Sequence, residues 1–241
     1  MKVAICISGQ PRAIRNGFAS ISKNLIIPNN ADVFFHTWFD KDSAGNRFRQ
    51  DTYPDLKIDP DTEDLLLELY KPKAYKIEKQ KCFKNSEWDI ENTKKVCLNH
   101  LSPSYIVDMM YCMWYSINQS NTIKEIFRLE NDINYDYVIR CRFDSGISRP
   151  LICSEFNLDT IWLSRPFDPH FLSLDDWFAL GSNDNLNVYA SAFLFMDFFR
   201  KSTTSKHRGI WTNESLVYDI VNKFEIGWSQ IPNFEHKCIR S

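Results

Sequence analysis

The sequence begins with an almost unbroken apolar run, Val3-Ala4-Ile5-Cys6-Ile7-Ser8, which is followed at once by Gly9-Gln10-Pro11-Arg12. Apolar runs without polar alternation are typical of strands that are buried on both faces in a parallel sheet. Glycine allows a tight turn after such a strand, and the free N–H groups at the start of a following helix can bind an anion. Residues 3–12 therefore predict a buried first strand, followed by either an anion-binding turn or an ordinary connection with solvated arginines.

Helices and strands are predicted to alternate after this run. Ile14, Phe18, Ile21 and Leu25 form one helical stripe, which Pro28-Asn29-Asn30 ends. The longest helix is expected to begin at Ser102-Pro103 and to bury a second apolar stripe, which ends with Ile123, Ile126 and Phe127. Further strands are expected at 33–38, 74–78, 137–142, 160–163, 177–181 and 226–231. Further helices are expected from Pro60, from Ser102-Pro103, and over 186–200 and 212–223. Residues 40–59 and 79–101 are expected to be loops. The alternation predicts an α/β fold in a single domain, residues 1–241, with a mostly parallel central sheet flanked by helices.

The composition limits the classes of function. Of the 241 residues, 44% are hydrophobic and 25% are charged, which excludes a disordered or fibrous chain. The 29 Lys and Arg against 31 Asp and Glu give a net charge of -2, so we expect no nucleic-acid partner, and any anion site must be local. The first apolar run is too short for a signal peptide, and no stretch reaches the length of a membrane span. The seven cysteines lack metal-ligand spacing and fit free thiols, so we expect a cytoplasmic location.

A second strand end carries charged residues. In residues 137–144 the strand period of two puts Arg140, Arg142 and Asp144 on one face. Guanidinium groups on a covered sheet face are costly unless they are paired or bind a ligand, and a diphosphate matches the fork of an arginine. The alternative is that both arginines pair with structural carboxylates such as Asp132 or Asp136.

Two further carboxylates are candidates for a general base. Asp175 and Asp176 precede an apolar strand, and Asp176 is expected at the edge of the sheet, where it could accept a proton or simply be a solvated loop residue. Glu214 lies near the start of a helix that begins after Trp211. It either complements the helix dipole or faces the cleft as a second carboxylate.

Together these segments resemble the motif series of nucleotide-sugar-dependent glycosyltransferases of the GT-A type, which occur in viral, phage and bacterial surface-glycan clusters. The resemblance covers most of the chain, and each of its motifs is short. It is carried by the first strand ending in Ser8-Gly9-Gln10-Pro11-Arg12, by Asp32-Val33-Phe34-Phe35-His36-Thr37-Trp38, by Tyr115-Ser116-Ile117, by residues 135–144, by Trp177-Phe178-Ala179-Leu180-Gly181-Ser182 and by Asn213-Glu214-Ser215-Leu216.

The resemblance implies a Rossmann-like domain in which residues 1–144 bind a nucleoside-diphosphate sugar and residues 145–241 bind a glycan or other hydroxyl acceptor. The residues that it implies for donor binding are Ser8, Gly9, Gln10, Arg12, Thr37, Trp38, Arg140 and Arg142. Such transfer needs positive charge for the departing diphosphate and, in an inverting enzyme, a carboxylate base. Asp176 is the first choice for that base and Glu214 the second. Whether the reaction inverts or retains the anomeric configuration stays open.

The resemblance also implies a divalent cation, Mn²⁺ or Mg²⁺, bound by the family's Asp-x-Asp motif. Asp144 occupies the last position of that motif, but Arg142 stands where the first acid is expected. His236, after the last strand, is expected as a further ligand. Equally, the arginines could replace the charge of the metal.

Two rival functions are a catalytically silent nucleotide- or glycan-binding module and another α/β enzyme, such as a hydrolase or phosphotransferase. The sequence contains no Gly-x-Ser-x-Gly elbow, no Walker loop and no His-Glu-x-x-His motif, which argues against the second class.

Overall fold

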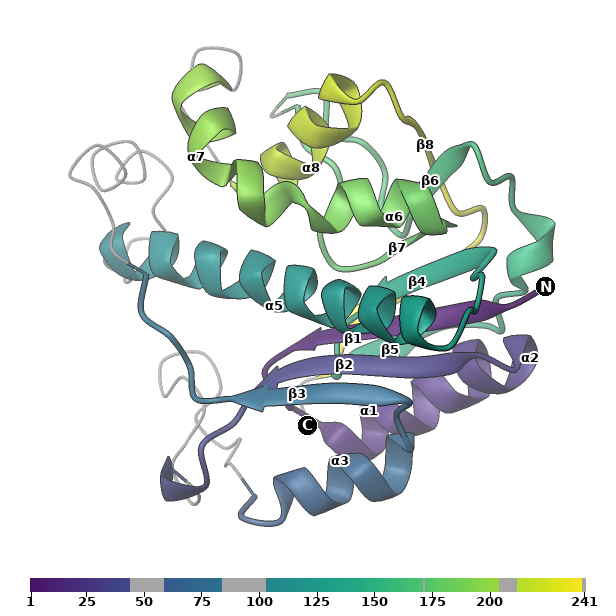
Figure 1. Ribbon diagram of the computed structural model, residues 1–241. Helices are drawn as coiled ribbons and strands as arrows, with labels where there is room; N and C mark the ends of the chain where they lie inside the picture. The colour runs from purple at the N-terminus through teal and green to yellow at the C-terminus, as the bar shows by residue number, and fades with distance from the viewer. Residues whose placement is uncertain (44–58, 84–102, 171, 204–211, 240–241) are drawn as a thin grey trace.

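The structure is a computed structural model that describes residues 1–43, 59–83, 103–170, 172–203 and 212–239 (Figure 1). Most of the two expected loops, 40–59 and 79–101, lies outside these ranges. The strands are β1 (Val3–Gly9), β2 (Asp32–Trp38), β3 (Ala74–Glu78), β4 (Tyr137–Cys141), β5 (Ser145–Ile147), β6 (Thr160–Leu163), β7 (Ala179–Ser182), β8 (Gly227–Gln230) and β9 (His236–Cys238). The helices are α1 (Ile14–Ile21), α2 (Ile27–Asn29), α3 (Thr62–Tyr70), α5 (Pro103–Glu130), α6 (Asn183–Ala190), α7 (Ala192–Thr203) and α8 (Asn213–Lys223), with a π-helical segment over Ser22–Ile26 and short 3₁₀ turns at Lys41–Ser43 and Cys153–Glu155.

Seven strands form one sheet in the order β3-β2-β1-β4-β7-β6-β8. β7 runs antiparallel to both of its neighbours, β4 and β6, and every other pair in this sheet is parallel. The fold is therefore mixed α/β with a mostly parallel central sheet, as the sequence predicted.

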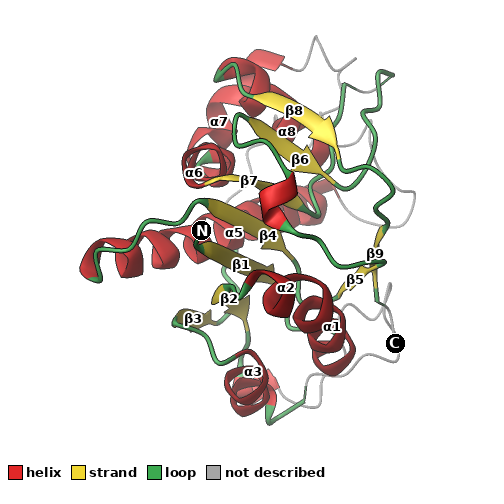
Figure 2. Cartoon of the chain, turned by 90° about the vertical axis from the view of Figure 1, so that its right-hand side faces the viewer, coloured by secondary structure: helices red, strands yellow, loops and turns green. Residues whose placement is uncertain are grey.

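Helices cover both faces of this sheet (Figures 1 and 2). Along β1, Val3, Ile5 and Ile7 join the core on the side of α1 and α3, whereas Ala4 and Cys6 join the core on the side of α5, α6 and α8. β1 is thus buried on both faces, which explains why its sequence is apolar without alternation.

Several predicted elements lie where the sequence placed them. The stripe of the first helix is confirmed, because Ile14, Ile21 and Leu25 are buried, and the helix ends where Asn30 adopts a left-handed conformation. The strand over 74–78 is confirmed as β3. The cysteines that lie inside the core are free thiols, namely Cys6, Cys112, Cys141 and Cys153.

Other boundaries were wrong. The helix expected from Pro60 begins at Thr62, after Asp61. The helix expected over 186–200 is two helices, α6 and α7, which meet at Ser191. The strand expected at 177–181 begins only at Ala179, and that expected at 226–231 covers Gly227–Gln230.

The buried face of the long helix α5 also differs from its expected apolar stripe. Ile126, expected to be inward, is 51% exposed, whereas Lys124 is fully buried. The Lys124 ammonium donates to the side-chain oxygens of Asn183 and Asn187 on α6 and lies 2.9 Å from a carboxylate oxygen of Glu125. Polar partners on α6 therefore replace apolar packing over this part of the helix.

Two three-residue strands, β5 and β9, form a small separate sheet that was not predicted. Ser145 pairs with Cys238 and Ile147 with His236, so the segment after Asp144 is held by the last described residues of the chain. No helix of the described residues combines the length and apolar character that crossing a membrane requires.

Candidate active site

The topology gathers the candidate residues at one edge of the sheet. β1, β2, β3, β4, β6 and β8 end at this edge, and the antiparallel β7 begins there, as the pairing of Arg140 with Ala179 shows. The order β3-β2-β1-β4 makes the gap between β1 and β4 the point where the chain reverses its direction of winding. In open α/β sheets ligands bind outside the strand ends at such a point.

The turn after β1 depends on Gly9. Its φ of +113° is a conformation that residues with a side chain rarely adopt, and no atom lies within 4 Å of the position a Cβ would take. The Gly9 N–H donates to Ser116 Oγ, and the Gly9 carbonyl accepts from Thr37 Oγ1. The turn is therefore fixed by α5 on one side and by β2 on the other.

The other residues expected for donor binding lie beside this turn. The Ser8 hydroxyl is buried without a hydrogen-bond partner among the described residues. Gln10 donates to the Gln80 side chain. Trp38 is buried, stacks on Tyr115 and donates its indole N–H to the carbonyl of Cys112.

A polar network that the sequence did not reveal supports the same turn. His36 Nδ1 lies 2.7 Å from Ser116 Oγ, and His36 Nε2 lies 3.0 Å from the carboxylate of Glu78. Burial lowers the pKa of His36 to about 4, although the hydrogen bond and the charge of Glu78 oppose this shift. Burial alone would raise the pKa of Glu78, but hydrogen bonds from His36, Lys81 and Tyr115 outweigh it and lower the pKa to about 2.

β4 ends at Cys141, so the strand alternation expected to continue through residue 144 stops there. The chain turns, with a hydrogen bond from the Ser145 N–H to the Arg142 carbonyl. Arg142 Nε and Nη2 donate to the two oxygens of Asp144 at 2.8 and 2.9 Å, and Arg12 Nε lies 3.5 Å from Asp144 Oδ2. Burial would raise the pKa of Asp144, but the charges of Arg142 and Arg12 hold it below its usual value.

Arg140 has a different environment. It is 2% exposed, and one of its terminal nitrogens donates to the backbone carbonyl of Asp176. Within the described part of the chain its Nε has no hydrogen-bond partner and no carboxylate forms an ion pair with it. Asp136, one of the expected structural partners, instead contacts the N-terminus and Lys2.

The adjacent carboxylates of Asp175 and Asp176 differ in their hydrogen bonds. Asp175 accepts hydrogen bonds from the hydroxyl and N–H of Ser164 and from the N–H of Trp177. Asp176 is equally buried, but its Oδ1 has no partner among the described residues. Burial, together with the charges of Glu214 and Asp175, raises the pKa of Asp176 well above its ordinary value.

Tyr189 on α6 belongs to the same buried cluster. Its hydroxyl also lacks a partner among the described residues, and its pKa is raised by burial and influenced by Arg140, Asp176 and Glu214. Three unpartnered polar groups, on Arg140, Asp176 and Tyr189, thus lie together between the sheet and its covering helices. Buried polar groups without partners are expensive, so such a cluster is typical of a ligand site.

Glu214 is positioned by the start of α8. Thr212 caps this helix, because its hydroxyl accepts from the Ser215 N–H while the Ser215 hydroxyl accepts from the Thr212 N–H. The carbonyl of Glu214 accepts from the N–H of Leu174, which ties α8 to the segment that carries Asp176. Both carboxylates expected as bases therefore lie in one region.

The guanidinium groups of two arginines lie over the ring of Trp177. Arg165 lies over its ring at 3.5 Å from the centroid, and Arg142 lies 5.5 Å from the same centroid. Arg165 follows β6 directly after Ser164, so it could have been found by the same rule of strand ends that singled out Arg142. Tyr189 lies on a helix face and offered no comparable signal.

His236 was expected to bind a metal together with Asp144. Its Nε2 lies 2.9 Å from Ser145 Oγ, and its Nδ1 has no partner among the described residues. Burial and the charges of Arg142, Arg140 and Arg165 lower its pKa to about 3. Among the residues that the structure describes, no three His, Cys, Asp or Glu side chains are grouped in a way that could hold a metal ion.

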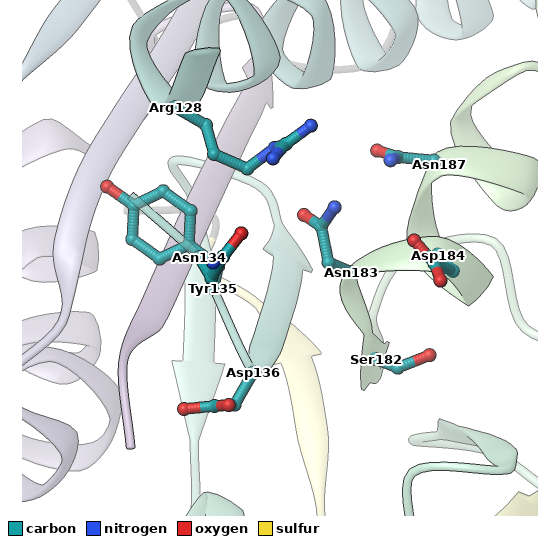
Figure 3. A pocket seen from close by; sticks show the side chains of 8 residues that line it. All are labelled: Arg128, Asn134, Tyr135, Asp136, Ser182, Asn183, Asp184 and Asn187. Carbon is teal, nitrogen blue, oxygen red and sulfur yellow. The ribbon is translucent and has the colours of Figure 1, made fainter. Parts of the chain in front are cut away.

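A surface pocket of about 240 Å³ lies at the opposite edge of the sheet, where β4 begins and β7 ends (Figure 3). It is lined by Arg128, residues 134–136, residues 182–184 and Asn187. None of the residues expected for donor binding or catalysis lines it. The polar cluster at the ends of β1 and β4 is therefore the better candidate for the active site.

No protein-family model matches the sequence, and no curated protein matches it. Among solved structures, the chain is similar to the apo form of the glycosyltransferase GlyE of Streptococcus pneumoniae TIGR4. The two sequences are 8% identical, the TM-score is 0.43, and the similar region covers 95% of this chain. It covers 44% of the GlyE chain, so this chain spans less than half the length of that protein.

Proposed function

We propose that this chain is a glycosyltransferase that moves a sugar from a nucleoside-diphosphate sugar to a hydroxyl of a glycan or other acceptor. The observation that carries the proposal is the buried pair of Arg140 and Asp176. Arg140 is a cation without an ion-pair partner in the described part of the chain, and Asp176 has a carboxyl oxygen without a hydrogen bond. Glycosyl transfer uses both groups, because charge grows on the departing phosphate while the acceptor loses a proton.

In the proposed reaction Asp176 accepts the proton of the acceptor hydroxyl. The acceptor oxygen bonds to the anomeric carbon, the bond from that carbon to the phosphate oxygen breaks, and its electron pair leaves with the diphosphate. Asp176 is favoured over Asp175 as the base because Asp175 already accepts three hydrogen bonds. Glu214 is the second candidate and, as a neighbouring charge, makes Asp176 more basic.

The donor is proposed to bind where β1, β2 and β4 end. The turn at Gly9 leaves space for a close approach, and Arg12 and Arg142 supply charge beside it. Ser8, Gln10, Thr37 and Trp38 complete this part of the site. Residues 145–241, which carry both candidate bases, are proposed to bind the acceptor.

The test is to incubate the protein with a panel of nucleoside-diphosphate sugars and hydroxyl acceptors and to measure the release of nucleoside diphosphate. Asp176→Asn should reduce turnover by about a hundredfold or more and leave donor affinity nearly unchanged, since the amide cannot accept the proton. Glu214→Gln is run in parallel. If Glu214→Gln abolishes transfer and Asp176→Asn does not, Glu214 is the base.

The rival function of a silent binding module makes a different prediction in the same assay. A module of that kind would bind donors, which a rise in melting temperature detects, but would release no nucleoside diphosphate from any of them.

A further inference from the structure

The residues expected to bind a divalent cation do not fit that role. Both oxygens of Asp144 accept hydrogen bonds from Arg142, and a second guanidinium, that of Arg12, lies 3.5 Å from one of them. The Nε2 of His236 is hydrogen-bonded to the hydroxyl of Ser145. A cation at Asp144 would have to displace guanidinium groups that already neutralise its carboxylate, and Mg²⁺ and Mn²⁺ prefer several oxygen ligands.

Positive charge is nevertheless concentrated where the cation was expected. Arg142 occupies the position of the missing first acid, and Arg165 reaches the same place from the end of β6. The two guanidinium groups share the ring of Trp177, at 3.5 Å for Arg165 and 5.5 Å for Arg142. A guanidinium that stacks on an aromatic ring is held in orientation while the N–H groups around its edge stay available for hydrogen bonds.

Arg165 is the better placed of the two to bind a ligand. In the described part of the chain its guanidinium makes no hydrogen bond, and the nearest carboxylate, that of Asp175, lies 4.0 Å away. Its side chain is 41% exposed, whereas that of Arg142 is 16% exposed. A planar guanidinium matches the paired oxygens of a phosphate group, which a spherical cation would otherwise bind.

We propose that Arg142 and Arg165, held against Trp177, bind the diphosphate of the donor and stabilise it as it departs, in place of a divalent cation. This inference rests on the proposed function. When the bond from the anomeric carbon to the phosphate oxygen breaks, the electron pair stays on that oxygen, and the two guanidinium groups neutralise the added charge.

Calorimetric titration with inorganic pyrophosphate tests this inference, first in excess chelator and then in millimolar Mn²⁺. Wild type should bind pyrophosphate in chelator, and Mn²⁺ should not tighten the binding. Arg165→Ala should weaken it about tenfold or more, and Arg165→Lys should recover part of the loss because it keeps the charge but not the planar fork. Arg128→Ala, which removes the same charge at the opposite edge of the sheet, should bind like wild type.

Arg142 is tested through the double variant Arg142→Ala/Asp144→Asn, because removing the arginine alone would leave the buried carboxylate of Asp144 without both of its hydrogen bonds from Arg142 and, in the described part of the chain, with only the ion pair to Arg12. The double variant should also bind pyrophosphate about tenfold more weakly in chelator. Binding that needs Mn²⁺, absence of binding in both conditions, or equal affinity of wild type and Arg165→Ala would overturn the inference. Metal-free, Arg165-dependent binding without any release of nucleoside diphosphate from sugar donors would instead support the arginine site and contradict the proposed transferase activity.

Discussion

The surroundings of Asp176 on balance oppose its ionisation. Burial is the largest cause of its raised pKa, and Glu214 and Asp175 add to it, while Arg140 and Arg142 act in the other direction without cancelling the shift. A general base works only when it is deprotonated. If Asp176 is that base, turnover should rise with pH over a range well above the one in which an ordinary aspartate titrates.

The first expected outcome concerns the charge of Glu214. Glu214→Gln removes a negative charge near Asp176, so it should lower the pKa of Asp176 and move the acidic limb of the pH profile of kcat/KM toward lower pH. The control is Glu225→Gln, which removes a carboxylate just beyond the other end of α8 and should leave the profile unchanged. If the acidic limb of the kcat/KM profile is the same in Glu214→Gln as in wild type, the group that titrates there is not Asp176.

The second expected outcome concerns stability. Because the folded-state pKa of Asp176 is raised, the native protein binds more protons than the unfolded chain above the ordinary pKa of an aspartate, so stability falls as pH rises through this interval. Asn carries no charge. Asp176→Asn should therefore melt at a higher temperature than wild type at pH 8, and the difference should shrink toward pH 4. Equal melting temperatures at both pH values would show that Asp176 ionises without cost in the fold.

At the scale of elements, α1 is held against the turn that carries Asp144. A Cβ on Gly17 would overlap the carbonyl oxygen of Phe143, and that carbonyl belongs to the backbone and cannot rotate away. Gly17→Ala should cost about 2 kcal/mol or more of unfolding free energy, because one element has to move. Gly227→Ala is the control, since its Cβ would meet its neighbours at 3.4 Å or more. Urea denaturation of the two variants measures the difference, and similar losses would show that α1 adapts freely.

The elements differ in how far the sequence predicted them. β1 and β3 were readable because their apolar residues and flanking turns are local signals. β5 and β9 were not, since three residues give no measurable period and their pairing joins distant parts of the chain. The same distinction applies to the site. Arg142 was recognisable at a strand end, but the sequence could not show that Asp144 would be its ion-pair partner.

Helix α5 illustrates a different limit. Its long apolar content predicted one buried stripe, but Lys124 and Ser116 are fully buried while Ile126 faces solvent. Lys124 is hydrogen-bonded to Asn187 on α6, and Ser116 to His36 on β2. The periodicity of the α5 sequence does not reveal these partners. Tertiary contacts therefore decide which side of this helix is inside.

For the molecule as a whole, two buried histidines make the folded protein less stable in acid. The pKa of His36 is lowered to about 4 and that of His236 to about 3, mainly by burial. At these two sites the unfolded chain then binds more protons than the native protein below pH 6.5, so the stability that the histidines contribute is complete above that pH and is lost as pH falls. As pH falls from roughly 6.5 to its folded-state pKa, each histidine should lower the free energy of unfolding by about 1.4 kcal/mol per pH unit.

Asp176 has a raised pKa and contributes the opposite slope over part of this range, so the slope of the histidines is measured by urea denaturation of Asp176→Asn at several pH values between 5 and 7.5. In the same Asp176→Asn background, His236→Asn should remove about half of this slope, and His170→Asn, at an exposed position, should leave it unchanged. Glu78 does not enter in this range, because its lowered pKa makes it lose stabilisation only at more acidic pH. In the Asp176→Asn background, a free energy of unfolding that is flat from pH 7.5 to 5 would contradict the burial of both histidines as neutral groups.

During synthesis, β9 leaves the ribosome after every strand of the main sheet. The seven strands of the main sheet, β1 to β4 and β6 to β8, can pair once β8 has emerged, whereas β5 has no partner until His236–Cys238 follows. His236 and the hydroxyl of Ser145 meet only at that step, beside the turn of Arg142 and Asp144. The order of synthesis therefore favours formation of the main sheet before the arginine-lined end of that sheet is fixed.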